Sequence, residues 1–174
     1  RIERTGSLQT GELIRLGIEL CRIMNYLHSF KPNPILYLDL HPGNLLICRE
    51  QLKLIDFDQA ALASLSQERS VCYGTKGFAA PEQYEGGTLD ERTDIYAIGA
   101  LLYYMGTGHA PEGEIKAGQG SCRGDLYILM GRCLRTEKKE RCQSVREVLE
   151  ALEKLEARIF AERHIPLLRI AAAG

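Results

Sequence analysis

The fold is decided by the loop Tyr37-Leu38-Asp39-Leu40-His41-Pro42-Gly43-Asn44. Two short apolar runs follow it, at residues 45–48 and 52–55, and Asp56 comes directly after the second run. Apolar runs of this length, separated by a few polar residues, predict an antiparallel β-hairpin. Because a hairpin returns the chain to its starting point, we expect Asp39, Asn44 and Asp56 to lie close together at the mouth of one cleft.

Helical patterns surround this loop on both sides. Apolar residues recur at helical spacing over residues 11–30, and residues 93–105 are apolar on nearly every side, as in a central core helix. Further helices are predicted over residues 125–134 and after Ser144, whose spacing to Glu147 fits a capping box. The order predicts a mostly α domain with a small β-hairpin element, α+β overall. Residues 59–80 and 110–123 are predicted to be loops.

Length and composition indicate a single ordinary soluble domain. The chain has 174 residues, a formal net charge of -1 and scattered rather than clustered lysines and arginines, which argues against a nucleic-acid partner. Its six cysteines form no C-x-x-C pair, so we interpret them as free thiols in a reducing cytoplasm. Cys21, Cys48 and Cys133 fall in apolar segments and are predicted to be core residues.

Five motifs together resemble protein kinases. The loop 37–44 resembles the H-R-D-L-K-P-x-N catalytic loop, and Asp56-Phe57-Asp58 resembles the metal-binding D-F-G triplet. Three more stretches follow in the family's order: Gly74-Thr75 to Ala80-Pro81-Glu82, Asp94-Ile95-Tyr96, and Cys133-Leu134 with Glu140 to Ser144. The resemblance covers residues 10–157 and is greatest to bacterial serine/threonine protein kinases of the eukaryotic type. It implies the C-terminal lobe of a kinase.

The resemblance implies roles for the loop residues. Asp39 would orient the substrate hydroxyl and accept its proton, while Asn44 and Asp56 would hold Mg²⁺. His41 stands where the family has a lysine that contacts the transferred phosphate of ATP, and it carries a full charge only when protonated. The alternative for Asp39, Asn44 and Asp56 is loop capping by Asx side chains, and the alternative for His41 is a loop residue without a catalytic part.

Other matching positions imply nucleotide contact, substrate class and support of the loop. Leu46 would lie under the adenine ring. Thr75 matches the threonine that bridges the catalytic aspartate and lysine in serine/threonine kinases, and its alternative is a plain turn residue. The remaining implied roles are structural: an ion pair of Glu82 with Arg141, a hydrogen bond from Asp94 to the catalytic-loop backbone, and Tyr37 with Phe57 packed beneath the site.

The chain departs from the family in several places. Leu38 replaces an arginine that receives an activation-loop phosphate, Asp58 replaces the glycine of the triplet, and residues 110–123 are short for the helix that docks protein substrates. No glycine-rich phosphate loop and no V-A-I-K lysine is present. We therefore expect residues 1–160 to be a C-terminal lobe whose partner is a missing N-terminal lobe.

The last residues, 161–174, are expected to be a C-terminal tail. They pass from basic into small apolar residues, which is typical of a juxtamembrane segment. A membrane tether beyond Gly174 would hold the protein at the cytoplasmic face of the membrane, and the alternative is a disordered or docked tail.

Three functions remain open from the sequence. The first is an ATP- and Mg²⁺-dependent kinase that phosphorylates serine or threonine of a protein substrate, and the second is a pseudokinase that serves as a binding or scaffold domain. The third is a small-molecule phosphotransferase, suggested by His41 and Pro42-Gly43 but disfavoured by the Ala80-Pro81-Glu82 segment.

Overall fold

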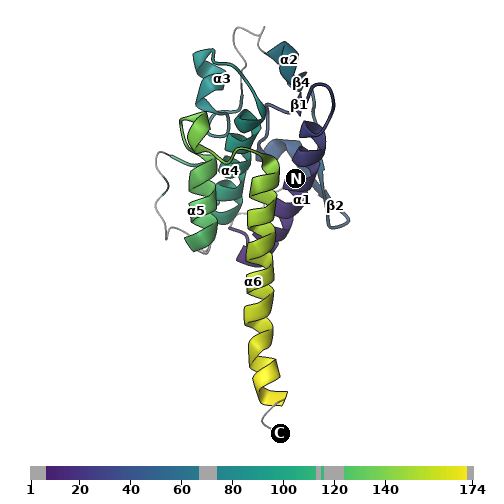
Figure 1. Ribbon diagram of the computed structural model, residues 1–174, viewed down its shortest axis with the longest axis vertical. Coiled ribbons are helices and arrows are strands. Elements are labelled where there is room, and N and C mark those ends of the chain that lie inside the picture. Colours follow the sequence, from purple (N-terminus) through teal and green to yellow (C-terminus); the bar gives the residue numbers. More distant parts are fainter. Residues whose placement is uncertain (1–6, 67–73, 113–114, 116–123, 172–174) are drawn as a thin grey trace.

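The structure is a computed structural model that describes residues 7–66, 74–112, 115 and 124–171, with side chains as far as residue 161. Helices make up most of it and the strands are short (Figure 1), which confirms the predicted mostly α fold with a minor β element. The predicted loops at 59–80 and 110–123 lie partly outside the described residues. The helices are α1 (Thr10–His28), α2 (Ala63–Ser66), α3 (Pro81–Glu85), α4 (Glu91–Thr107), α5 (Gly124–Cys133) and α6 (Val145–Ala171), with 3-10 turns at η1 (Pro42–Asn44) and η2 (Lys138–Glu140).

The hairpin predicted after the loop is present as β2 (Leu45–Cys48) and β3 (Gln51–Leu54). Its strands are antiparallel, with Leu45 opposite Leu54 at the end nearest the loop. The Glu19 carboxylate of α1 accepts a hydrogen bond of 2.9 Å from the Leu52 amide, which ties β3 to the helix. A second antiparallel pair joins β1 (Ile35–Leu36) to β4 (Ala61–Leu62). Strand β4 and helix α2 lie within residues 59–80, which we predicted to be a loop, whereas no element was predicted at β1.

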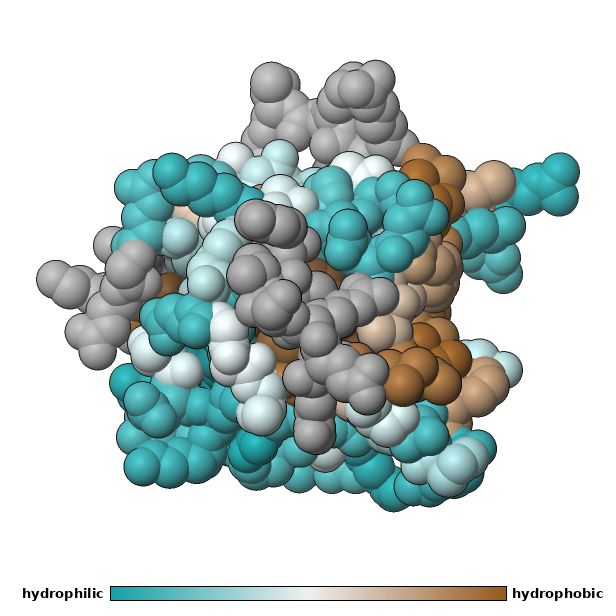
Figure 2. All heavy atoms as spheres, turned by 90° about the horizontal axis from the view of Figure 1, so that it is seen from above, coloured by the Kyte–Doolittle hydropathy of each residue, from teal (hydrophilic) through white to brown (hydrophobic). Residues whose placement is uncertain are grey.

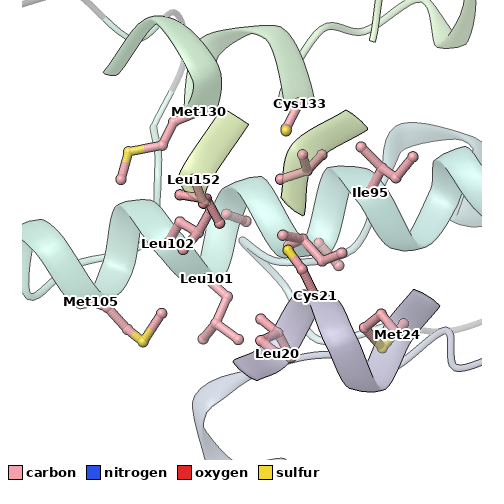
Figure 3. Packing of buried hydrophobic residues seen from close by; sticks show 14 of the residues in the cluster. Leu20, Cys21, Met24, Ile95, Leu101, Leu102, Met105, Met130, Cys133 and Leu152 are labelled. Carbon is pink, nitrogen blue, oxygen red and sulfur yellow. The ribbon is translucent and has the colours of Figure 1, made fainter. Parts of the chain in front are cut away.

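The core is centred on α4, as its apolar sequence predicted. Figure 3 shows α4 between α1, which contributes Leu20 and Met24, and α5, which contributes Met130. The approach of α4 to α5 is close at Gly99, where a Cβ atom would lie 2.5 Å from the Cβ atom of Cys133. Glycine at this position therefore lets the two helices come into contact.

The cysteines differ in part from the prediction. Cys21 and Cys133 are fully buried, as expected, but Cys48 is exposed because it lies at the turn end of the hairpin. Cys142, which we did not assign to the core, is also fully buried, with its Sγ atom 4.0 Å from that of Cys133. Cys72 and Cys122 lie outside the described residues. The four described cysteines are free thiols.

Helix α6 runs without a break from Val145 to Ala171 and extends beyond the body of the molecule (Figure 1). The predicted capping box at its start is only half formed, because Glu147 reaches the Gln143 amide at 2.8 Å instead of the amide of Ser144. The predicted tail begins inside this helix, and its side chains beyond residue 161 lie outside the described part. Within the described residues, no helix has the length and apolar character needed to span a bilayer.

Helix α4 begins at Glu91, two residues before the predicted start, and Asp90 caps it. The Asp90 carboxylate accepts from the Arg92 amide at 2.9 Å and pairs with the Lys138 ammonium at 3.0 Å. Burial opposes the ionisation of Asp90, but the hydrogen bonds from Arg92 and Lys138 outweigh it and lower its pKa to about 2.

This low pKa predicts an acid-sensitive contribution to stability. A carboxylate with a depressed folded-state pKa stabilises the protein above its unfolded pKa of about 4, and this stabilisation is lost as the pH falls towards 2. Asp90→Asn is expected to lower the free energy of unfolding by about 1–2 kcal/mol at neutral pH and to flatten its pH dependence below about pH 4. Urea unfolding at several pH values measures this. Asp125→Asn, at an exposed ion pair, is the matched control, and equal slopes for wild type and Asp90→Asn would refute the assignment.

Candidate active site

The Asp39 carboxylate is the centre of the candidate site. Its Oδ1 atom accepts a hydrogen bond of 2.9 Å from the Thr75 hydroxyl, which lies 36 residues later in the chain. The Asn44 amide nitrogen donates to the Asp39 backbone oxygen at 3.0 Å and to Oδ2 at 3.3 Å. About a fifth of the Asp39 side chain is exposed, so the carboxylate is both oriented and open to a substrate.

His41 lies beside this carboxylate, with Nε2 at 3.6 Å from Asp39 Oδ2. Its Nδ1 atom accepts a hydrogen bond of 3.2 Å from the Gly43 amide. Because a backbone amide only donates, this contact assigns the proton of the neutral ring to Nε2, the atom that faces Asp39. His41 is therefore placed to donate a hydrogen bond at the site without carrying a charge.

The hairpin returns the chain to the same end of the loop. The Ile55 amide donates to the Asn44 carbonyl oxygen at 3.0 Å, so Asp56 directly follows a residue bonded to Asn44. Burial raises the pKa of the Tyr37 hydroxyl, and the carboxylates of Asp39 and Asp56 raise it further, because both lie close to the phenol. Two observations thus support the predicted convergence of Asp39, Asn44 and Asp56. The hairpin brings Ile55 back to Asn44, and the carboxylates of Asp39 and Asp56 both lie near the Tyr37 hydroxyl.

These residues can be compared with the needs of Mg²⁺. The cation prefers oxygen ligands, keeps several water molecules, and is commonly held by one or two carboxylates together with substrate phosphates. Asp56 provides a carboxylate and Asn44 an amide oxygen, which fits such a partly open site. In the described part of the chain, no group of three or more His, Cys, Asp or Glu side chains could hold a metal ion, so the donor set does not fit a closed metal site.

Asp94 supports the loop from α4, as predicted. It is fully buried, and its carboxylate accepts from the Tyr37 amide at 2.9 Å and from the Leu38 amide at 2.8 Å. His28, at the end of α1, contacts the same carboxylate through Nε2 at 2.8 Å. We did not single out His28 in the sequence, because a histidine at the polar end of a helix gives no signal of a partner 66 residues away.

Two residues of the candidate site, Leu38 in the loop and Asp56 after the hairpin, have unusual backbone angles. Leu38 has a φ of 66° and Asp56 a φ of 62°, in the left-handed region that residues other than glycine rarely adopt. Each such residue costs about 1–3 kcal/mol and persists where its surroundings hold it. For Leu38 the hydrogen bond from its amide to Asp94 provides part of this support.

An apolar surface lies beside the site. Tyr37 and Phe57 pack edge to face with ring centroids 5.2 Å apart, as predicted, although Phe57 remains half exposed. Ile47, Ile55 and Leu62 are also exposed. Figure 2 shows apolar surface gathered on the right of the view, the side on which Figure 1 places the hairpin. Leu46 of β2 is half-buried on this hairpin.

The predicted ion pair of Glu82 and Arg141 is confirmed. The guanidinium is 1% exposed and forms two parallel bonds to the carboxylate, of 2.7 and 2.8 Å. Its other N–H groups donate to the backbone oxygens of Arg92, Arg135 and Thr136. Burial opposes the ionisation of Glu82, but the hydrogen bonds from Arg141 outweigh it, so the pKa of Glu82 is lowered.

Comparison with known proteins identifies the family. Residues 1–163 match the family described as the protein kinase domain. Serine/threonine-protein kinase A of Synechocystis is 29% identical over 179 residues, which cover 88% of this chain and 34% of that protein. Serine/threonine-protein kinase PknB of Mycobacterium leprae is 31% identical over 115 residues, or 63% of this chain and 18% of that protein.

A plant protein matches to a similar degree. Integrin-linked protein kinase 1 of Arabidopsis thaliana is 33% identical over 115 residues, which cover 62% of this chain and 24% of that protein. The chain therefore spans about a third or less of the length of these relatives. Since the family match extends over nearly all of its residues, the chain belongs to the protein kinase domain family.

Proposed function

We propose that this chain is the catalytic lobe of a serine/threonine protein kinase, which transfers the γ-phosphate of ATP to a hydroxyl group of a protein substrate. The observation that carries the proposal is the hydrogen-bonded group of Asp39, Asn44 and Thr75, drawn from two distant parts of the chain. Phosphoryl transfer depends mainly on positioning and electrostatic stabilisation, and this group positions a carboxylate that stays open to solvent.

Each residue of the site has a role in this proposal. Asp39 orients the substrate hydroxyl and accepts its proton, and Thr75 and Asn44 hold the carboxylate in place. Nε2–H of His41 donates to the phosphoryl group where the family has a lysine. Asn44 and Asp56 would hold Mg²⁺, which would supply the positive charge that neutralises the phosphate oxygens.

The apolar surface beside the hairpin is proposed to receive the adenine ring over Leu46 and the missing N-terminal lobe. Exposed apolar patches of this kind mark binding surfaces. The serine/threonine preference is supported by Thr75 and by two relatives, each of which is a serine/threonine-protein kinase.

The second candidate function is a pseudokinase that binds partners without transferring phosphate. It is favoured by Leu38 and Asp58, which replace an arginine and a glycine of the family pattern. The active kinase is preferred because a scaffold has no physical need for an oriented, open carboxylate next to an amide and a hydroxyl. We also propose that the protein is tethered to a membrane beyond Gly174, which is compatible with each of these functions.

The experiment that tests the function compares two proteins. Residues 1–174 alone are expected to bind ATP weakly and to transfer no phosphate, because the sequence lacks the glycine-rich loop and strand lysine that cradle the phosphates. The full-length protein is expected to phosphorylate serine or threonine of a generic protein substrate in the presence of Mg²⁺. Radiolabelled ATP and phosphoamino-acid analysis measure both. Turnover by residues 1–174 that is lost in Asp39→Asn would overturn the division into lobes, whereas inactive full-length protein would favour the pseudokinase.

A further inference from the structure

Gln83 is a buried polar side chain that joins two parts of the candidate site. It is 1% exposed and belongs to α3, directly after the Pro81-Glu82 pair. Its Nε2 atom donates a hydrogen bond of 2.8 Å to the carbonyl oxygen of Leu38, and its Oε1 atom accepts one of 3.0 Å from the Ala80 amide. The two contacts connect the loop that carries Asp39 with the segment that follows Thr75.

The orientation of this amide is determined by its partners. The Ala80 amide only donates, so it must face Oε1, and the Leu38 carbonyl only accepts, so it must face Nε2. A glutamate at this position would keep the bond to Ala80 but would place a carboxylate oxygen against the Leu38 carbonyl oxygen. A methionine of similar length would make neither bond. The site is therefore matched to glutamine.

The backbone groups of the two residues before Asp39 are each hydrogen-bonded to a buried side chain. Asp94 accepts from the amides of Tyr37 and Leu38, and Gln83 donates to the carbonyl of Leu38. That carbonyl and the amide of Asp39 belong to the same planar peptide group. A hydrogen bond that holds the carbonyl oxygen therefore also fixes the orientation of the Asp39 amide. The φ of 66° at Leu38 makes this support necessary, since the left-handed region is unfavourable for leucine.

We infer that Gln83 is a positioning residue for Asp39, which holds the Leu38–Asp39 peptide and thereby aligns the carboxylate with Thr75. This inference rests on the proposed kinase function. Gln83 does not touch the reacting atoms: it acts through the backbone of Leu38 and through the Ala80 amide. Any shift of the segment around Ala80 is transmitted by the same side chain to the peptide in front of Asp39.

The test uses the full-length kinase with Gln83→Glu and Gln83→Met. Both variants lose the donor to Leu38, so kcat is expected to fall about ten- to a hundredfold, the scale of a misplaced catalytic group, while KM for ATP changes little. When protonated, the introduced carboxyl group can donate to Leu38, so the activity of Gln83→Glu relative to wild type should rise as pH falls. Gln83→Met should show no such rise. Gln51→Glu makes the same chemical change at an exposed site and is the control.

A second measurement follows the backbone of Leu38 in residues 1–174 by NMR. The coupling between its amide and α protons reports φ and should shift in both Gln83 variants but not in Gln51→Glu. Gln83→Met introduces no buried charge, so it remains the test variant if Gln83→Glu does not fold. A folded variant with wild-type kcat, or with lowered kcat and unchanged Leu38 signals, overturns the inference. If wild type transfers no phosphate, the proposed function fails, and the Leu38 signals alone decide whether Gln83 holds the peptide.

Discussion

Replacing Arg141 by methionine is expected to lower the free energy of unfolding by about 3–5 kcal/mol. The substitution leaves the Glu82 carboxylate buried without its bidentate partner. It also removes the donors to three backbone oxygens, those of Arg92, Arg135 and Thr136. A buried charge without a partner is far more costly than the loss of an exposed pair, because water cannot replace the missing bonds. Urea unfolding of residues 1–174 measures the effect.

The control for this prediction is Arg146→Met. Arg146 forms an exposed pair with Glu150 at 3.0 Å within α6, and pairs of this kind contribute about 0.3–0.5 kcal/mol. The double variant Glu82→Leu/Arg141→Leu should be less destabilised than the sum of its single variants, because it leaves no unpaired buried charge. Equal losses in Arg141→Met and Arg146→Met would contradict the structural role of the ion pair.

Asp39→Asn is expected to lower kcat of the full-length kinase by about 10²–10⁴-fold, the contribution of a positioned general base. The amide has nearly the same shape and can still accept a bond from Thr75, but it cannot take a proton from the substrate hydroxyl. The KM for ATP and the thermal unfolding midpoint should therefore change little. Steady-state kinetics at saturating Mg²⁺-ATP measure the loss. The control is Asp125→Asn, which alters an exposed pair with Arg158 in another part of the molecule.

The sequence predicted the parts of the fold that have a periodic pattern. The core helices, the hairpin after the loop and the pairing of Glu82 with Arg141 are present as expected. Long apolar patterns predict elements well because burial of one face determines them. The Glu82–Arg141 pair was implied by the resemblance to kinases, since no local pattern links residues 59 positions apart.

The misses have physical reasons in each case. The start of α4 was placed late because its first turn is polar and its apolar run begins at Ile95, whereas the cap is Asp90. Cys48 was assigned to the core from its apolar neighbours, but the end of a hairpin strand leaves it exposed. The strands β1 and β4 have two residues each, which is too short for an alternating pattern to be read.

The candidate site likewise contains residues that the sequence predicted and residues that it did not. Asp39, Asn44 and Thr75 were singled out in the sequence, and Asp39 accepts hydrogen bonds from both of the others. His28 and Gln83 were not, because their partners Asp94 and Leu38 are 66 and 45 positions away and a lone polar residue in a helix carries no pattern. Supporting contacts of this kind become visible only when the chain is folded.

The proposed kinase function depends most directly on a phosphate transfer for which Asp39 is the base. In a single-turnover experiment, the full-length protein is mixed with limiting radiolabelled ATP, Mg²⁺ and an excess of protein substrate, and transfer is followed in wild type, Asp39→Asn and Asp125→Asn. We predict label on serine or threonine with wild type and Asp125→Asn, and a rate lower by about 10²–10⁴-fold with Asp39→Asn, although all three bind ATP equally well. Wild-type protein that binds Mg²⁺-ATP but transfers no label, or an Asp39→Asn variant as fast as wild type, would contradict the central claim.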